Sequence, residues 1–232
     1  LAGQLFIWII VVVIALFRAG DSADSAAVQR EVLSLAPAGL IFSVLASGLS
    51  VFALYRRKMG PAAMSAAGRE LGWGAVAPAH MLVGFLFGLA IALAYLMGAP
   101  RLAESPRLTD MGILSQLAAA GGVARAAWAV AGVGLAPVLE ETVFRGALFT
   151  GVERSWGRTA AVVLTTVVFA ALHLPDVGAY WPAAGAITLL GLVTALLRAR
   201  TGRIAPSIAA HAAFNLVMVL TVYGIGFPVR TG

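Results

Sequence analysis

Three ionisable side chains, Glu140, Glu141 and Arg145, interrupt a stretch of sequence that is otherwise apolar enough to cross a membrane. Each ionised side chain at the centre of a membrane-spanning helix costs roughly 2.5–3.5 kcal/mol, so the three together set a penalty near ~9 kcal/mol. A chain that carries this penalty is expected to use the residues. Glu141 and Arg145 are four residues apart and can form an ion pair on one helix face, as a purely structural pair or one that orients a substrate. Glu140, about 100° round the helix, is then the carboxylate left for chemistry.

Three more polar side chains of catalytic type lie in later apolar segments: His173, His211 and Asn215. His211 and Asn215 are four residues apart and therefore share a helix face. A carboxylate, two imidazoles and a carboxamide from three helices can form a hydrolytic site. Glu140 would accept a proton from water, one imidazole would orient that water, and the other imidazole with Asn215 would donate hydrogen bonds to an oxyanion. In the alternative, His173 caps a helix end, and His211 and Asn215 only join neighbouring helices.

The spacing of these residues forms three motifs in order along the chain. Residues 140–145 fit EExxxR, residues 169–173 fit FxxxH, and residues 211–215 fit HxxxN. With these motifs, residues 126–223 resemble the CPBP (or ABI) family of intramembrane glutamic endopeptidases, which includes CAAX prenyl endopeptidases and bacterial proteins linked to bacteriocin processing and self-immunity.

The resemblance implies a role for each motif residue. Glu140 would activate the water with His173 as its partner, His211 and Asn215 would stabilise the oxyanion, and Glu141 with Arg145 would support the site. It also implies a mechanism without a metal or other cofactor. A zinc site built from the two histidines and a carboxylate is the alternative, although the HExxH motif of many zinc proteases is absent from the sequence.

The composition indicates an integral membrane protein. Of the 232 residues, 61% are hydrophobic and 11% are charged, and the mean hydropathy is +0.95, whereas soluble domains are about 45–50% apolar and about 25% charged. The absence of cysteine excludes disulfides and thiol chemistry. The net charge is +6, and the basic residues cluster in short loops. Because the sequence contains no nucleic-acid-binding motif, the expected partners are the lipid bilayer and a membrane-associated protein or peptide substrate.

The apolar runs predict an all-α polytopic membrane protein of about seven transmembrane helices around a polar intramembrane catalytic cavity, in one domain that spans residues 1–232. Members of the resembled family often have eight transmembrane helices. The first run, Leu5–Phe17, is short enough to be a signal-peptide core instead, and because the chain begins with Leu1 we expect its reading frame to begin upstream or to be processed. The seven spans are residues 5–17, 35–55, 75–97, 126–149, 160–174, 181–197 and 204–223, and residues 61–73 and 101–117 are expected at the interface.

The charges of the predicted loops are asymmetric. The even-numbered loops hold nine basic and two acidic residues, a net charge of +7, whereas the opposite side holds six of each sign. The positive-inside rule therefore predicts cytoplasmic even-numbered loops and an external C-terminus. An Ala-, Gly- and Arg-rich composition with a single lysine points to a bacterial cytoplasmic membrane and to a substrate without a prenyl group, although a CAAX-type substrate is the alternative within the family.

Two other classes of function compete with the protease. A proton-coupled transporter can use buried glutamates and histidines as a relay, but it predicts polar positions in both halves of the chain, and here they gather in the second half. A non-catalytic membrane scaffold or immunity protein would keep the same residues for stability.

Overall fold

A computed structural model describes residues 14, 57–58, 60–102, 122–177 and 180–225. This part of the chain contains helices, turns and loops and no strand, which confirms the predicted all-helical class for these residues. The elements are α3 (Pro78–Leu102), α5 (Gly122–Val130), η2 (Ala131–Leu135), α6 (Ala136–Glu141), η3 (Thr142–Leu148), α7 (Phe149–Val177), α8 (Trp181–Thr201) and α9 (Ala205–Val222), of which η2 and η3 are π-helical.

The chain divides into two compact units. The first, Leu1–Met64 with Ala119–Ala131, includes α5. The second, Ser65–Ala118 with Gly132–Gly232, includes α3 and the elements from α6 to α9, and every predicted site residue belongs to it. The organisation of the whole chain as one domain remains a prediction.

Four helical stretches among the described residues are long and apolar enough to cross a membrane: Pro78–Leu102, Gly122–Leu174, Trp181–Thr201 and Ala205–Val222. They confirm an integral membrane protein. Helices α3, α8 and α9 correspond to the predicted third, sixth and seventh spans. The predicted spans 5–17 and 35–55, and most of the interfacial segment 101–117, lie outside the described residues, so the count of seven remains a prediction.

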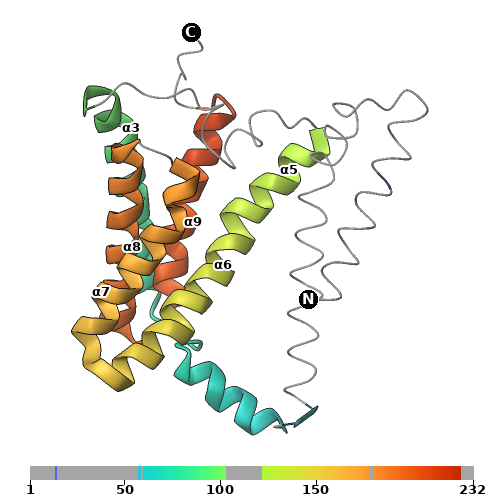
Figure 1. Ribbon diagram of the computed structural model, residues 1–232. Coiled ribbons are helices and arrows are strands. Elements are labelled where there is room, and N and C mark those ends of the chain that lie inside the picture. The colour runs from blue at the N-terminus through green and yellow to red at the C-terminus, as the bar shows by residue number, and fades with distance from the viewer. Residues whose placement is uncertain (1–13, 15–56, 59, 103–121, 178–179, 226–232) are drawn as a thin grey trace. The chain divides into compact units, whose positions relative to one another are not determined.

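The stretch Gly122–Leu174 contains the predicted fourth and fifth spans. Its 53 residues would measure about 80 Å as a straight helix, far more than the ~30 Å hydrocarbon core of a bilayer. Gly157 breaks the helix within α7, with φ +83° and ψ 171°, a conformation that residues with a Cβ rarely adopt. The chain reverses direction within α7 (Figure 1), so the two spans are two arms of one long helical stretch.

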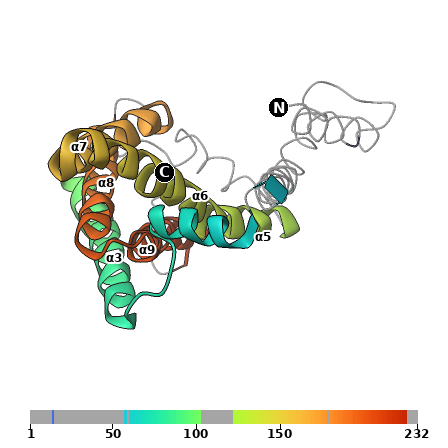
Figure 2. The same ribbon diagram turned by 90° about the horizontal axis from the view of Figure 1, so that it is seen from below.

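Helices α3, α8 and α9 pack against one another around a shared core. Seen end-on, α9 lies between α3 and α6 (Figure 2). The buried core residues contributed by the three helices are Ile91, Ala92, Ala186, Leu190, Phe214 and Val217. In a bilayer such contacts are favourable because of close packing rather than exclusion of water.

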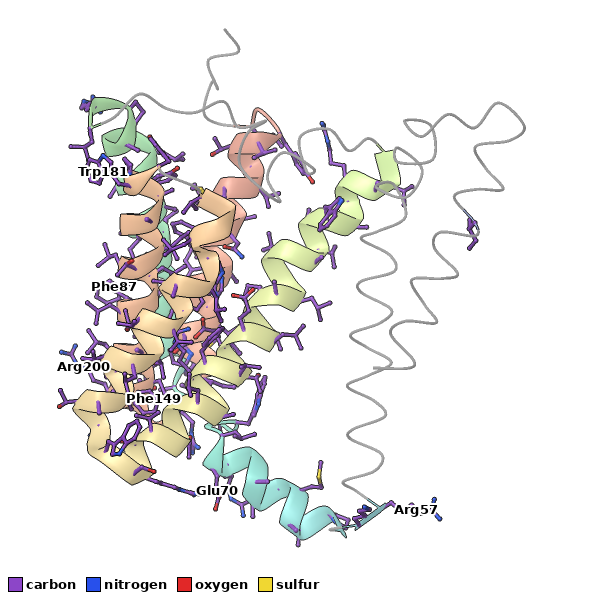
Figure 3. The ribbon with its side chains drawn as sticks, in the orientation of Figure 1. Arg57, Glu70, Phe87, Phe149, Trp181 and Arg200 are labelled. Carbon is purple, nitrogen blue, oxygen red and sulfur yellow. The ribbon has the colours of Figure 1, made fainter. Side chains whose placement is uncertain are left out.

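The outward faces of this bundle are apolar. Phe87 on α3 and Trp181 at the start of α8 point away from the other helices (Figure 3), and their exposed fractions are 48% and 56%. Leu82, Val83 and Leu86 share the exposed surface of α3. Large apolar side chains in such positions are what a lipid-facing helix surface requires.

Gly84 and Gly88 allow the backbones of α3 and α9 to touch. A Cβ added to Gly84 would overlap the carbonyl oxygen of Pro206, and one added to Gly88 would overlap the carbonyl oxygen of Ala210. The GxxxG spacing is therefore used for helix packing, as such motifs commonly are. The contact at Ala210 lies directly beside His211, so α3 sets the position of that histidine.

We expect Gly88→Ala to destabilise the protein and to displace His211, because the added methyl group must push α9 away. Overpacking of this kind costs about 1–3 kcal/mol, and thermal unfolding in detergent measures it. Gly98→Ala in the same helix is the matched control, because its Cβ would meet nothing within 4 Å. An equal loss of stability in both variants would contradict the proposed contact between α3 and α9.

Candidate active site

The two glutamates lie at the end of α6, a helix of only six residues between two π-helical segments. A π-helix pairs each amide with the carbonyl five residues earlier, and short π-helical segments are frequent at functional sites. Pro137, the second residue of α6, is buried. Because proline has no N–H, it cannot donate a backbone hydrogen bond at this point, and α6 is a short α-helical part of a continuous helical stretch in which the hydrogen-bond pattern changes on both sides.

Glu141 and Arg145 form the buried ion pair that their spacing predicts. Both side chains are 0% exposed, and Arg145 Nε lies 3.3 Å from Glu141 Oε2. Arg145 Nη2 also donates to the carbonyl oxygen of Gly191 in α8 at 2.7 Å. Two partners therefore offset the cost of burying the guanidinium, and the pair joins η3 to α8.

His211 lies between the two glutamates and contacts both. Its Nδ1 is 2.9 Å from Glu141 Oε1, and its Nε2 is 3.9 Å from Glu140 Oε2. Since a carboxylate only accepts hydrogen bonds, Nδ1 carries the hydrogen and Nε2 faces Glu140. The sequence did not predict this contact, because we expected Glu141 to meet only Arg145.

His173 approaches Glu140 from α7. Its Nε2 lies 3.5 Å from Glu140 Oε2, while its Nδ1 donates to the carbonyl oxygen of Phe169 at 2.7 Å. The Phe169 ring lies against the imidazole with 4.4 Å between centroids, a contact that the four-residue spacing of the FxxxH motif allows within one helix face. Both histidines thus use Nδ1 for support and direct Nε2 towards Glu140.

Phe169 is the apolar centre of the site. It is 1% exposed, its ring meets His211 edge-on at 5.6 Å, and Arg145 Cζ lies 4.5 Å from its centroid. Gly191 lies so close to Phe169 that a Cβ there would come within 3.1 Å of the ring. The ring therefore fixes both imidazoles and the guanidinium at once, a role that the FxxxH spacing alone did not reveal.

Asn215 makes a contact that the sequence did not predict. Its Nδ2 donates to the carbonyl oxygen of Gly132 in η2 at 2.7 Å. The oxyanion role that the resemblance implies for Asn215 remains a prediction, and one of its two amide hydrogens is used by Gly132.

Arg198 lies one residue beyond the predicted span 181–197, so we counted it among the nine basic residues of the even-numbered loops. The structure corrects this, because Arg198 belongs to α8 and is 7% exposed. Its Nε donates to the carbonyl oxygen of Arg145 at 2.9 Å, and its Nη2 lies 3.3 Å from the carbonyl oxygen of Glu70. A guanidinium offers five donors, so Arg198 can satisfy the backbone at the base of the site while remaining buried.

We refer to Glu140, Glu141, Arg145, His173 and His211 as the polar cluster. The structure brings these five predicted residues together from α6, η3, α7 and α9. Glu140 and His173 are the accessible members, with 31% and 26% of their side chains exposed, whereas His211 is 5% exposed. A molecule that enters the cluster therefore meets Glu140 and His173 first.

The alternative prediction for the polar cluster was a zinc site. Within the described residues, no group of three or more His, Asp or Glu side chains is arranged to hold a metal ion. The mechanism without a metal remains a prediction.

The comparison with protein families matches the same part of the chain. Residues 122–217 fit a family model described as type II CAAX prenyl endopeptidase Rce1-like. No curated protein and no solved structure gives a match. The matched residues contain the whole polar cluster and Asn215, and the family is one of proteases. Residues 122–217 are therefore similar to the type II CAAX prenyl endopeptidase Rce1-like family, which belongs to the CPBP family that the three motifs resemble.

Proposed function

We propose that the protein is an intramembrane endopeptidase that hydrolyses a peptide bond with a water molecule activated by Glu140. The observation that carries the proposal is the position of Glu140, whose buried Oε2 faces the Nε2 atoms of two histidines while its side chain as a whole is 31% exposed. A general base must lie within reach of the proton that it removes and of the groups that orient its water. Glu140 and His173 meet that requirement.

The tautomer of His173 suggests how the attacking water would be held. Because His173 Nδ1 donates to a carbonyl, Nε2 of the neutral imidazole is an acceptor. A water beside Glu140 and His173 would donate one hydrogen to each of them and direct a lone pair at the scissile carbonyl carbon. Glu140 would take the proton as the C–O bond forms, and would return it to the leaving amine as the C–N bond breaks.

His211 would act on the oxyanion. Its Nδ1 donates to the buried Glu141, the arrangement by which a carboxylate fixes the orientation of a catalytic histidine. With a proton on Nε2, the ring would donate to the carbonyl oxygen that becomes negative in the tetrahedral intermediate. Glu141 and Arg145 would support this step from behind.

The proposed substrate is a membrane-associated protein or peptide. The family favours a CAAX-type substrate, whereas the composition of the chain favours a bacterial substrate without a prenyl group. Quantitative proteomics of membranes that contain either the wild-type chain or a Glu140→Ala copy would test the proposal. An uncleaved membrane protein should accumulate with the variant, and identical membrane proteomes would favour the scaffold.

We further propose that the protein lies in a bacterial cytoplasmic membrane with its even-numbered loops in the cytoplasm. The chain lacks cysteine, so single cysteines report orientation without background from the chain itself. Arg200 at the end of α8 is exposed (Figure 3), and Ile225 follows α9 and is also exposed. In intact cells a membrane-impermeant maleimide should label Ile225→Cys but not Arg200→Cys, and the reverse pattern would show the opposite orientation.

A further inference from the structure

Pro137 leaves one backbone carbonyl of the catalytic segment without its usual partner. In the i→i+5 pattern of a π-helix, the carbonyl of Gly132 would accept from the amide of residue 137. Residue 137 is proline, which has no N–H, and it is buried directly after η2. A backbone carbonyl without a partner inside a membrane costs several kcal/mol.

Asn215 supplies the missing donor. Its Nδ2 lies 2.7 Å from the carbonyl oxygen of Gly132, although the two residues are 83 positions apart in the sequence. We propose that Asn215 is a positioning residue, whose amide replaces the backbone hydrogen bond that Pro137 removes and thereby fixes the start of α6.

The position of α6 is then determined by two residues of one helix face. Asn215 binds the carbonyl of Gly132, which precedes α6. His211 lies one turn earlier in α9 and binds Glu141, the last residue of α6. Because these two hydrogen bonds lie on either side of Glu140 in one continuous helical stretch, they help to define where Glu140 lies relative to His211 and His173. The HxxxN motif would thus orient the carboxylates from both ends.

This role differs from a direct contact with the oxyanion, and a double-mutant cycle separates the two. Pro137→Ala restores an N–H that can reach Gly132. Asn215→Leu removes the amide at nearly constant side-chain size. In the wild-type background we expect Asn215→Leu to lower kcat by about 10-fold or more. In the Pro137→Ala background we expect it to lower kcat by about 3-fold or less, because the new backbone N–H would take over the hydrogen bond to Gly132 and the two substitutions are therefore coupled. An equal loss of kcat in both backgrounds would overturn the proposal and assign Asn215 to the oxyanion.

The catalytic part of this inference rests on the proposed endopeptidase, but the hydrogen bond does not. The same cycle is therefore measured by thermal unfolding in detergent with the Glu140→Gln variant, which requires no activity. Asn215→Leu should lower the midpoint much less when Pro137→Ala is present, and additive shifts would overturn the hydrogen-bond replacement whatever the enzyme does. If Asn215→Leu prevents folding in the wild-type background, folding of the Pro137→Ala double variant supports the proposal, and failure of both variants contradicts it.

Discussion

Glu140→Gln is expected to lower the turnover of an identified substrate by about 10² or more while the protein remains folded and inserted. Glutamine keeps the size of the side chain and its contacts with the two imidazoles, but its amide cannot accept the proton of the attacking water. His173→Ala should have a similar effect, because the water would lose the acceptor that orients it. Turnover is measured as cleavage of the purified substrate in detergent or in vesicles.

Glu153→Gln is the matched control for this experiment. Glu153 pairs with Arg158 at 2.9 Å, but both side chains are accessible, with exposed fractions of 31% and 68%. Exposed pairs contribute about 0–1 kcal/mol, so we expect unchanged turnover. Near-wild-type cleavage by Glu140→Gln would refute the proposed base, and loss of cleavage on strong chelation would favour the zinc alternative over the mechanism without a metal.

Arg145→Ala should destabilise the protein more than Glu140→Gln does. It removes the charge that balances the buried Glu141 and one of the donors to the carbonyl oxygen of Gly191, which also accepts from Thr194 Oγ1. Stranding one member of a buried ion pair costs about 3–5 kcal/mol, which corresponds to a lowering of the unfolding midpoint by about 6–20 °C for a chain of this size. Glu140→Gln should lower it far less, since the Glu140 side chain is 31% exposed.

The double variant Glu141→Gln with Arg145→Met should recover much of this loss. Methionine fills the space beside Phe169 without a charge, and glutamine can still accept the hydrogen bond from His211 Nδ1. Thermal unfolding in detergent compares the single and double variants. Equal midpoints for Arg145→Ala and Glu140→Gln would show that the pairing of Glu141 with Arg145 does not stabilise the fold as proposed.

Local helix geometry explains which features could be predicted from the sequence. The pairs Glu141–Arg145 and Phe169–His173 are both separated by four residues, and both are in contact. In a helix this spacing brings two side chains onto one face whatever surrounds them. The length and apolarity of α3, α8 and α9 likewise predicted their spans, because a bilayer core requires about 20 apolar residues.

Contacts between distant residues had to come from the tertiary structure. The sequence predicted catalytic roles for His211 and Glu140, but not that the His211 ring bridges both glutamates. Likewise, Arg198 looked like a loop charge until its hydrogen bonds to the carbonyls of Arg145 and Glu70 were seen. Such contacts depend on how helices pack, and a helix face that is suitable for packing does not specify its partner.

The residue types and spacings of Glu140, His173, His211 and Asn215 were sufficient by themselves to predict a membrane-embedded hydrolytic site and to suggest the family whose model matches residues 122–217. Only the folded chain decided how the site is supported, through the close approach of Gly88 to α9 and the bond from Asn215 to Gly132. The physical reason is that Pro137 has no backbone N–H and Gly88 has no Cβ. The sequence alone cannot show that the amide of Asn215 replaces the first, or that the backbone of α9 occupies the space of the second.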